Sequence, residues 1–416
     1  MSQKLCIFAC QMTFFMKQTT HSPVGPTTEK QRYTVLDSMR GLALLGIALA
    51  NFPEFGLWTF LSGDARAAMP TAGIDKVVRF VEYWLVEGKF YSIFSILFGI
   101  GFSIFLSRHG TRRFVRRMLI LLLIGLVHLL LIWNGDILLL YAVGGLLLVL
   151  FVRASDRMLL ALAVFFILLP AGLDAWSQWQ GIDMAAPLYD AWWRQAASSG
   201  ITEANFASWL RDADSYAVMF EFLKQGSIER MWEFVSGHRL LKVIGLFLIG
   251  YLIGRHRLYA HIEEMRPQLK RAFFWTLSVM LPLSFVFAWS ATHGEPWGMA
   301  VHSLLYAVSV VPLALAFMMG VCLWLRPFEV FKSAGRMALT CYIGQSLIGI
   351  FLFYGIGLGW GTRFGFVHIE LTAFIAFFAE VLVCRLWLRH FSFGPLEWLW
   401  RMLTYGKWMR LRKSAD

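Results

Sequence analysis

Residues 108–152 read RHGTRRFVRRMLILLLIGLVHLLLIWNGDILLLYAVGGLLLVLFV. An arginine-rich segment comes first, then an apolar run, the short polar turn at 134–136, and a second apolar run. A helix needs about 20 apolar residues to cross the hydrocarbon core of a bilayer. The first run fills that length and the second comes close to it. This stretch therefore predicts two membrane-spanning helices joined by a tight turn.

The same alternation of apolar runs and polar loops continues along the chain. Hydrophobic residues make up 58% of its 416 residues and charged residues 15%, against roughly 45–50% and about 25% in soluble domains. Lipid-exposed backbone must satisfy its own hydrogen bonds, and the period-2 alternation of a barrel is absent, so the spans are predicted to be helices. We expect an all-α polytopic membrane protein with about ten transmembrane helices. The predicted spans are 36–53, 90–106, 114–133, 137–152, 158–173, 241–254, 272–290, 299–325, 337–358 and 366–388.

Basic residues are concentrated in alternate loops, which predicts the orientation of the chain. By the positive-inside rule these loops face the cytoplasm, so both termini are predicted to be cytoplasmic, in the cytoplasmic (inner) membrane of a bacterium. The net charge of +12 then indicates topology and contacts with anionic lipid head groups, and not nucleic-acid binding. The basic segments are 108–117, 153–157, 255–271, 326–336 and the tail after residue 388.

The predicted spans divide the chain into five regions. The segment 173–240 is rich in tryptophan and is expected either to roof a cavity on the outer leaflet or to form only an aromatic belt. The N-terminal segment is expected to be disordered, with translation starting at Met16. The tail is expected to lie on anionic lipid of the inner leaflet. The regions are a cytoplasmic leader at 1–32, a five-helix half at 33–172, an outer loop region at 173–240, a second five-helix half at 241–388 and a basic amphipathic tail at 389–416.

Several polar residues lie near the predicted cytoplasmic surface and are candidates for substrate binding. Charged groups at membrane depth cost roughly 2.5–3.5 kcal/mol, so each needs a partner or a role. Asp37 and Arg40 are three residues apart on one helix face. They form either an ion pair that anchors the helix end or a site where Arg40 meets a phosphate or carboxylate. Arg336 and Gln345 run inward from the same surface. Asn51, at the outer end of the first span, is also a candidate for substrate binding, although an interhelical hydrogen bond is the favoured role.

A second group lies near the predicted outer surface. Histidine is suited to proton transfer near neutral pH, which makes His128 a candidate catalytic base and Asp136 its candidate partner. Along one continuous helix the two would be about 12 Å apart, so contact requires the turn to fold back. A structural histidine that bonds to a neighbouring helix is the alternative. Glu87, Lys89 and His302 are candidates for substrate binding in a pocket shared with this pair.

The chain carries no motif for a metal or nucleotide site. HExxH, Walker A, GxSxG and GxGxxG-plus-acid patterns are absent, and the five cysteines have no metal-ligand spacing. We therefore expect no metal and no bound cofactor. Cys322, Cys341 and Cys384 lie in apolar spans and are interpreted as small buried hydrophobes.

Five motifs together resemble a known family. The chain is similar to the YeiB-like bacterial membrane proteins, which carry the domain of unknown function numbered 418 at their C-terminal end, and the resemblance runs from about Tyr33 to Lys407. It implies a helical membrane fold and no assigned activity. The motifs are LDSMRGLALLGIALANF at 36–52, GKFYSIFSILFGIGF at 88–102, NGDILLLYAVGGL at 134–146, AGRMALTCYIGQSLI at 334–348 and FGPLEWLWRMLTYGK at 393–407.

The LDxxRG opening of the first span also resembles membrane acyltransferases of the acyltransferase-3 and heparan-glucosaminide acetyltransferase types. That resemblance implies acyl-CoA as a cytoplasmic co-substrate near Arg40 and Arg336. It also implies a small-molecule acceptor and a histidine that either deprotonates the acceptor hydroxyl or amine or carries the acyl group briefly. The chain departs from those families at Asn51, because no histidine ends the first span and His128 would have to take the role. Such an enzyme requires a cavity that joins Arg40 to His128.

Two other functions stay open. A transporter would use the same charges as a substrate path, although the sequence shows no matched pair of Gly/Pro-broken spans and no repeat of its first half. A non-catalytic assembly or sensor protein would have a solid core between Arg40 and His128.

Overall fold

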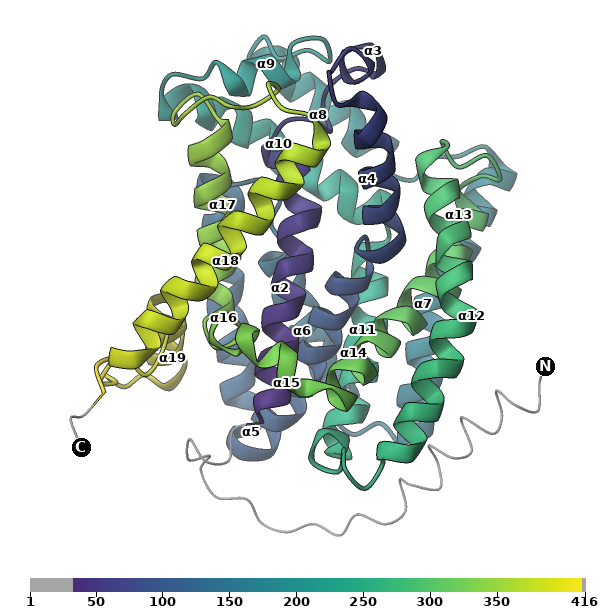
Figure 1. Cartoon of the computed structure of the whole chain (residues 1–416), viewed down its shortest axis with the longest axis vertical. Helices are drawn as coiled ribbons and strands as arrows, with labels where there is room; N and C mark the ends of the chain where they lie inside the picture. Colours follow the sequence, from purple (N-terminus) through teal and green to yellow (C-terminus); the bar gives the residue numbers. More distant parts are fainter. Residues whose placement is uncertain (1–32, 414–416) are drawn as a thin grey trace.

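The computed structural model describes residues 33–413, and its elements are helices (Figure 1). The described residues form no β-strand, only an isolated bridge between Phe391 and Arg412, so the predicted all-α class is confirmed. The predicted leader and the start at Met16 lie outside the described residues. The main helices are α2 (Thr34–Phe55), α3 (Gly63–Ala67), α4 (Ala72–Leu85), α5 (Lys89–Leu131), α6 (Leu138–Leu148), α7 (Asp156–Gln180), α8 (Ala186–Ser198), α9 (Phe206–Arg211), α10 (Tyr216–Ser236), α11 (Arg239–Arg255), α12 (Arg266–Thr292), α13 (Met299–Leu305), α14 (Val311–Leu323), α15 (Leu325–Phe328), α16 (Lys332–Arg336), α17 (Ala338–Phe353), α18 (Phe366–His390) and α19 (Pro395–Tyr405).

The number of membrane spans depends on how broken helices are counted. Within the described chain, 6 helices are long and apolar enough to cross a bilayer, or up to 8 if each of two bent pairs is one span. All ten predicted spans overlap helices, but the number ten stays a prediction. The helix α5 shows why the counts differ: Gly110 has φ 72° and ψ 171°, so two helical arms meet there in one continuous element. Glycine takes this positive φ without steric cost.

The bent pairs were not visible in the sequence. The helices α10 and α11 meet at 63°, and the segment Leu325–Arg336 meets α17 at 80°. The first break lies at Gly237 and His238, and the second at Met337, which has a non-helical ψ of 36°. Neither break carries a proline. The sequence therefore shows no broken spans, whereas residues 33–413 contain two bent helix pairs.

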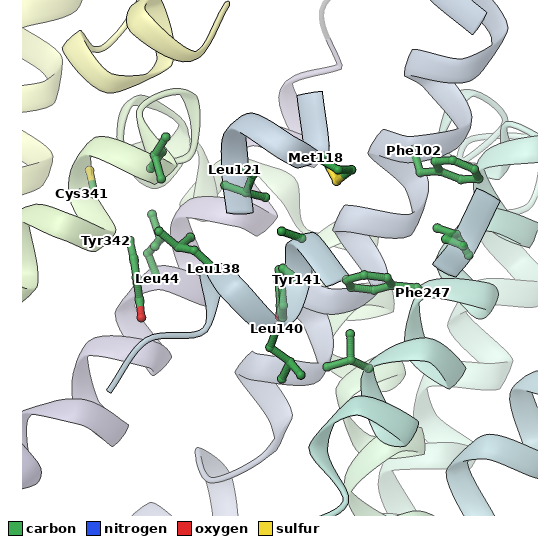
Figure 2. Packing of buried hydrophobic residues seen from close by; sticks show 14 of the residues in the cluster. Leu44, Phe102, Met118, Leu121, Leu138, Leu140, Tyr141, Phe247, Cys341 and Tyr342 are labelled. Atoms are coloured by element: carbon green, nitrogen blue, oxygen red, sulfur yellow. The ribbon is translucent and has the colours of Figure 1, made fainter. Parts of the chain in front are cut away.

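The helix α2 runs through the middle of the bundle, with α5, α16, α17 and α18 around it (Figure 1). Its contacts are close because small residues face each other: a Cβ added to Gly335 would lie 1.8 Å from the Asp37 carbonyl oxygen. Figure 2 shows the adjoining core, where Leu44 of α2, Tyr141 of α6 and Phe247 of α11 are all buried. Dense van der Waals packing of this kind holds helices together in lipid, where the hydrophobic effect adds little between them.

The two ends of the bundle differ in what covers them. The helices α3, α8, α9 and α10 gather at one end, whereas α15 and α19 lie toward the opposite end (Figure 1). The second end carries the basic loops that the positive-inside rule places in the cytoplasm. We call the first the outer end and the second the inner end, and the assignment to the two sides of a membrane stays a prediction.

Candidate functional site

Three buried side chains from separate segments form a hydrogen-bonded chain at the outer end. The Nδ1 atom of His128 lies 2.8 Å from Asp136 Oδ2, and its Nε2 atom lies 3.0 Å from Ser346 Oγ. His128 and Asp136 are 0% exposed and Ser346 is 1% exposed. The carboxylate accepts the Nδ1–H proton, which leaves Nε2 to accept from the serine hydroxyl. This is the arrangement of an Asp–His–Ser proton relay, and we call these three residues the relay.

The chain folds back after α5, and this reversal brings Asp136 to His128. The backbone N–H of Trp133 donates to the His128 carbonyl at 2.8 Å and closes the last turn. Asp136 then caps α6, because its Oδ1 accepts from the Leu139 N–H at 2.7 Å. One carboxylate thus serves the helix start and the imidazole together. The condition that the turn must fold back is met.

Tyr342, one turn before Ser346 on α17, clamps the same reversal. Its hydroxyl accepts from the Ile137 N–H at 3.2 Å and donates to the Gly135 carbonyl at 3.1 Å. The Ser346 hydroxyl has a second acceptor in the Tyr342 carbonyl at 3.4 Å, but the imidazole nitrogen is closer. Two residues on one face of α17 therefore hold both the turn and the imidazole.

The helix α10 supports the turn from its other side. Arg230 donates from Nε to the Asn134 carbonyl at 2.8 Å, and the Asn134 amide donates to Glu229 at 3.0 Å. This contact needs Gly226, because a Cβ there would lie 2.7 Å from Asn134 Cβ. The sequence placed 173–240 outside the membrane half, so these supporting residues were missed. Their only sequence signal is a run of charges in an apolar helix.

A half-buried set of charges lies beside Arg230. Its guanidinium forms an ion pair with Glu233, which lies 4.0 Å from Arg239 Nη2. Glu54, at the end of α2, interacts electrostatically with these residues and with Glu87. The side chains of Glu233 and Arg239 are 25% and 41% exposed. We call Glu54, Glu87, Glu233 and Arg239 the charged rim, and it includes one predicted substrate-binding residue, Glu87.

Lys89 and His302 belong to a different group of contacts. Lys89 is 0% exposed, and its Nζ donates to the Tyr83 carbonyl at 2.7 Å and lies 5.0 Å from the Phe287 ring centre. The His302 ring packs on the same phenylalanine at 4.9 Å. His128 instead packs against the Tyr342 ring and hydrogen-bonds to Asp136 and Ser346. The structure thus separates the predicted shared pocket into two clusters.

Close to this second cluster, Asp174 joins three helices. Its Oδ1 accepts from His238 Nε2 at 2.8 Å, and its Oδ2 accepts from the Ser303 hydroxyl at 2.5 Å. His238 starts α11 with φ 48°, a left-handed conformation that non-glycine residues seldom adopt. Asp174 therefore ties α7, α11 and α13 together at the break between α10 and α11.

At the inner end the predicted residues are paired. Arg40 Nη1 lies 2.8 Å from Asp37 Oδ1, as the ion-pair interpretation expects. Arg336 donates to the Ser392 carbonyl at 3.4 Å, and Gln345 donates to Glu380 at 3.1 Å. Asn51 lies at the other end of α2 from this ion pair and is half-buried.

Between the two ends the core is closely packed. Leu44, one turn after Arg40, is 0% exposed. One pocket of the described chain opens near Tyr33 and Arg257, and neither Arg40 nor His128 lines it.

The cysteines within the described chain are buried or half-buried. Cys341 and Cys384 are both buried, with their Sγ atoms 3.3 Å apart, and Cys322 is half-buried. Cys6 and Cys10 lie outside the described residues. Within residues 33–413 no group of three or more His, Cys, Asp or Glu side chains is placed to hold a metal ion.

The fold and the relay define the class: a helical membrane protein that buries an ionisable polar centre inside its bundle. The family model described as "Protein of unknown function (DUF418)" matches residues 253–407. The chain is 30% identical over 407 residues to the uncharacterized protein YeiB of Escherichia coli (strain K12), which covers 90% of this chain and 96% of the relative. It therefore belongs to the YeiB-like DUF418 family, as its motifs predicted.

Two further relatives align over nearly their whole length. The uncharacterized protein YxaH of Bacillus subtilis (strain 168) is 28% identical over 416 residues, covering 95% of this chain and 99% of the relative. An uncharacterized 39.9 kDa protein of Bacillus acidopullulyticus is 27% identical, covering 94% and 100%. No solved structure matches the chain. The resemblance to membrane acyltransferases is not tested by these comparisons and stays a prediction.

Proposed function

We propose that this protein is an acyltransferase-like enzyme of the bacterial inner membrane. In this proposal it moves an acyl group from cytoplasmic acyl-CoA to an envelope or secondary-metabolite acceptor. The observation that carries the proposal is the relay itself: His128 lies between Asp136 at 2.8 Å and Ser346 at 3.0 Å. A carboxylate on Nδ1 and a hydroxyl on Nε2 are the two contacts that a histidine base needs to activate a nucleophile.

The chemistry then follows in two balanced steps. His128 takes the Ser346 proton while Oγ attacks the thioester carbonyl, and the thiol leaves with that proton, which gives an acyl-serine and free CoA. His128 next takes a proton from the acceptor hydroxyl, whose oxygen attacks the ester carbonyl, and Ser346 leaves with the proton. The product is the acylated acceptor, and the relay returns to its starting state. Asp136 stabilises the imidazolium in both steps.

The core between Arg40 and His128 is closely packed, so in this proposal the cavity that an acyltransferase requires forms only when the buried relay opens. Ser346 sits on α17, which begins at the 80° bend after Met337. A break in a helix provides a pivot, and opening of a buried site often limits turnover. In this proposal α17 moves away from α5, and the charged rim orients the acceptor.

The test is acyl transfer by the purified full-length protein in liposomes, with acetyl-CoA as donor and release of free thiol as the readout. We expect Ser346→Ala and His128→Gln to lower turnover by about 10³-fold or more, as for other nucleophile–base pairs. Ser303→Ala is the matched control, because that serine also donates to a buried aspartate but lies outside the relay. Full transfer by His128→Gln would remove the assignment of the base. A wild-type protein with no turnover on any acceptor would instead support a non-catalytic assembly role.

A transporter is the second candidate, and the two bent helix pairs favour it. Broken helices expose backbone groups that bind substrates and ions in many transporters, and here one break adjoins the charged rim. This function predicts uptake or efflux of a small molecule by liposomes with no covalent change. Loss of that flux in Arg239→Gln, together with normal flux in Ser346→Ala, would separate transport from acyl transfer.

A further inference from the structure

Two cysteine side chains from different helices meet in the core of the bundle. Cys341 lies on α17 (Figure 2) and Cys384 on α18, and they are 2% and 3% exposed. Their Sγ atoms are 3.3 Å apart. The sulfurs of a disulfide are about 2.05 Å apart, so bond formation requires a movement of roughly 1 Å. The two thiols are therefore close enough to react with each other.

A contact one turn away holds the two helices in this register. The Gln345 amide on α17 donates to Glu380 on α18 at 3.1 Å. These two residues lie one turn along their helices from the two cysteines. Gly344 allows the close approach, because a Cβ there would lie 2.8 Å from Glu380 Oε1. The pairing of 341 with 384 and of 345 with 380 is that of two antiparallel helices, so helix packing keeps the thiols opposed.

The thiol pair has an apolar environment. Both cysteines belong to the core cluster that contains Phe331 and Phe377. Charged reagents are excluded from such a core by the cost of desolvation, whereas hydrogen peroxide is small and neutral. Cys322 on α14 is half-buried and contacts no other thiol within residues 33–413. It therefore provides an internal comparison for a cysteine without a neighbour.

We propose that Cys341 and Cys384 are an oxidative modification site, at which hydrogen peroxide converts the two thiols into a disulfide that joins α17 to α18. One thiol attacks the peroxide O–O bond, forms a sulfenic acid and releases water. The second thiol attacks the sulfenic sulfur, forms the S–S bond and releases a second water. The two thiols together lose two electrons and two protons, and the peroxide is reduced to water. Capture by the neighbouring thiol prevents further oxidation to a sulfinic acid.

The position of the pair makes the bond reversible and gives it a consequence. Cys341 lies one turn after the bend at Met337, at the end of α17 that contacts Glu397 of α19. This end is predicted to face the cytoplasm, where glutathione and thioredoxin reduce disulfides. A disulfide would fix the base of α17 to α18, which itself packs on α2 and α4. The opening of α17 would then have to move α18 as well, and this consequence, unlike the modification itself, rests on the proposed function.

The experiment treats the full-length protein in liposomes with hydrogen peroxide, alkylates the remaining thiols with N-ethylmaleimide and maps unreduced peptides by mass spectrometry. We expect a linked pair of peptides that carry Cys341 and Cys384 and that dithiothreitol separates. Oxidation should also raise the midpoint of thermal unfolding by about 5 °C or more. Cys384→Ala is the matched control: the remaining Cys341 thiol should be oxidised to a sulfinic acid, without linked peptides and without the rise in midpoint.

Acyl transfer is the second readout. Turnover by the wild type should fall after peroxide and return after dithiothreitol, whereas Cys341→Ala/Cys384→Ala should not respond to this cycle. Linked peptides in a protein that transfers no acyl group would support the modification site and count against the proposed function alone. Linked peptides with unchanged turnover would overturn the effect on α17.

The modification site itself has a separate test. Peroxide is raised to a concentration that oxidises Cys322, and the state of the other two thiols is then read from the peptide map. Recovery of Cys341 and Cys384 as two alkylated thiols, or as two separate sulfinic acids, would overturn the proposal.

Discussion

At the outer end His128 and Asp136 are 0% exposed and fully hydrogen-bonded, whereas at the inner end Arg257 lines an open pocket in a strained conformation. A buried polar group that loses its partner costs its whole desolvation free energy. A group at an open pocket can instead exchange its partner for water. Substitutions that remove a buried partner at the outer end should therefore lower stability more than substitutions at the inner end.

Asp136→Ala should give the largest effect. It removes the His128 partner and the cap on the Leu139 N–H, and loss of one member of a buried pair costs about 3–5 kcal/mol. We expect a matching loss in the free energy of unfolding, measured by chemical denaturation in detergent. Asp212→Ala is the control: it breaks an exposed ion pair with Arg211, which is worth about 1 kcal/mol or less. Equal losses in the two variants would contradict the contrast between buried and open sites.

Arg230→Gln should give the next largest effect. The variant loses the bond to the Asn134 carbonyl and the ion pair with Glu233. Two charge-assisted hydrogen bonds to a buried group suggest a loss of about 2–3 kcal/mol. Arg239→Gln removes a side chain that is 41% exposed, and the same unfolding measurement should show little change. If Arg239→Gln were the more damaging of the two, the support of the turn by α10 would be wrong.

Ser346→Ala separates stability from function within the relay. Its loss removes one neutral hydrogen bond and little volume, so we expect a cost of about 1 kcal/mol in unfolding free energy. Acyl transfer should nevertheless fall by about 10³-fold or more. If the Ser346→Ala variant were active, Ser346 would not be the nucleophile, and His128 could act only as a base directly on the acceptor.

Arg257→Gly should have almost no effect on stability or should raise it. The substitution relieves a left-handed conformation, and such relief contributes up to about 1 kcal/mol. The readout is the unfolding midpoint without ligand. A large loss of stability would mean that the Arg257 side chain supports the fold.

The smallest expected effect is the pH dependence of Glu295, in the outer loop before α13. Burial raises its pKa above the usual 4.5, and the charge of Asp174 adds to this. The stability that Glu295 contributes is therefore fully present below its usual pKa of 4.5 and is lost as the pH rises through its raised pKa in the folded protein. Glu295→Gln should match the wild type near pH ~4 and be slightly more stable near pH ~8, with a modest difference because the side chain is partly solvated. If Glu295→Gln were less stable than the wild type near neutral pH, the Glu295 charge would stabilise the fold and the prediction would be wrong.

The helices were predictable because each span carries its own signal. Lipid demands a long apolar run with internal hydrogen bonds, and residues 114–133 or 366–388 show that run without reference to the rest of the chain. The breaks at Gly237–His238 and Met337 were not predictable, because contacts from other helices stabilise them. At Met337 the carboxylate of Glu397 on α19 accepts from the Leu339 and Thr340 N–H groups at 2.7 and 3.0 Å.

The site divides in the same way. The sequence by itself determined that His128 and Asp136 lie near one end of the bundle, because a tight polar turn between two membrane-spanning helices must lie close to a membrane surface. Only the tertiary structure decided that they touch, that Ser346 and Arg230 join them, and that Lys89 and His302 belong elsewhere. Helical periodicity relates residues within one element, whereas these contacts join α5, α10 and α17. Their partners are set by how the helices pack, which depends on small residues such as Gly226 and not on spacing along the chain.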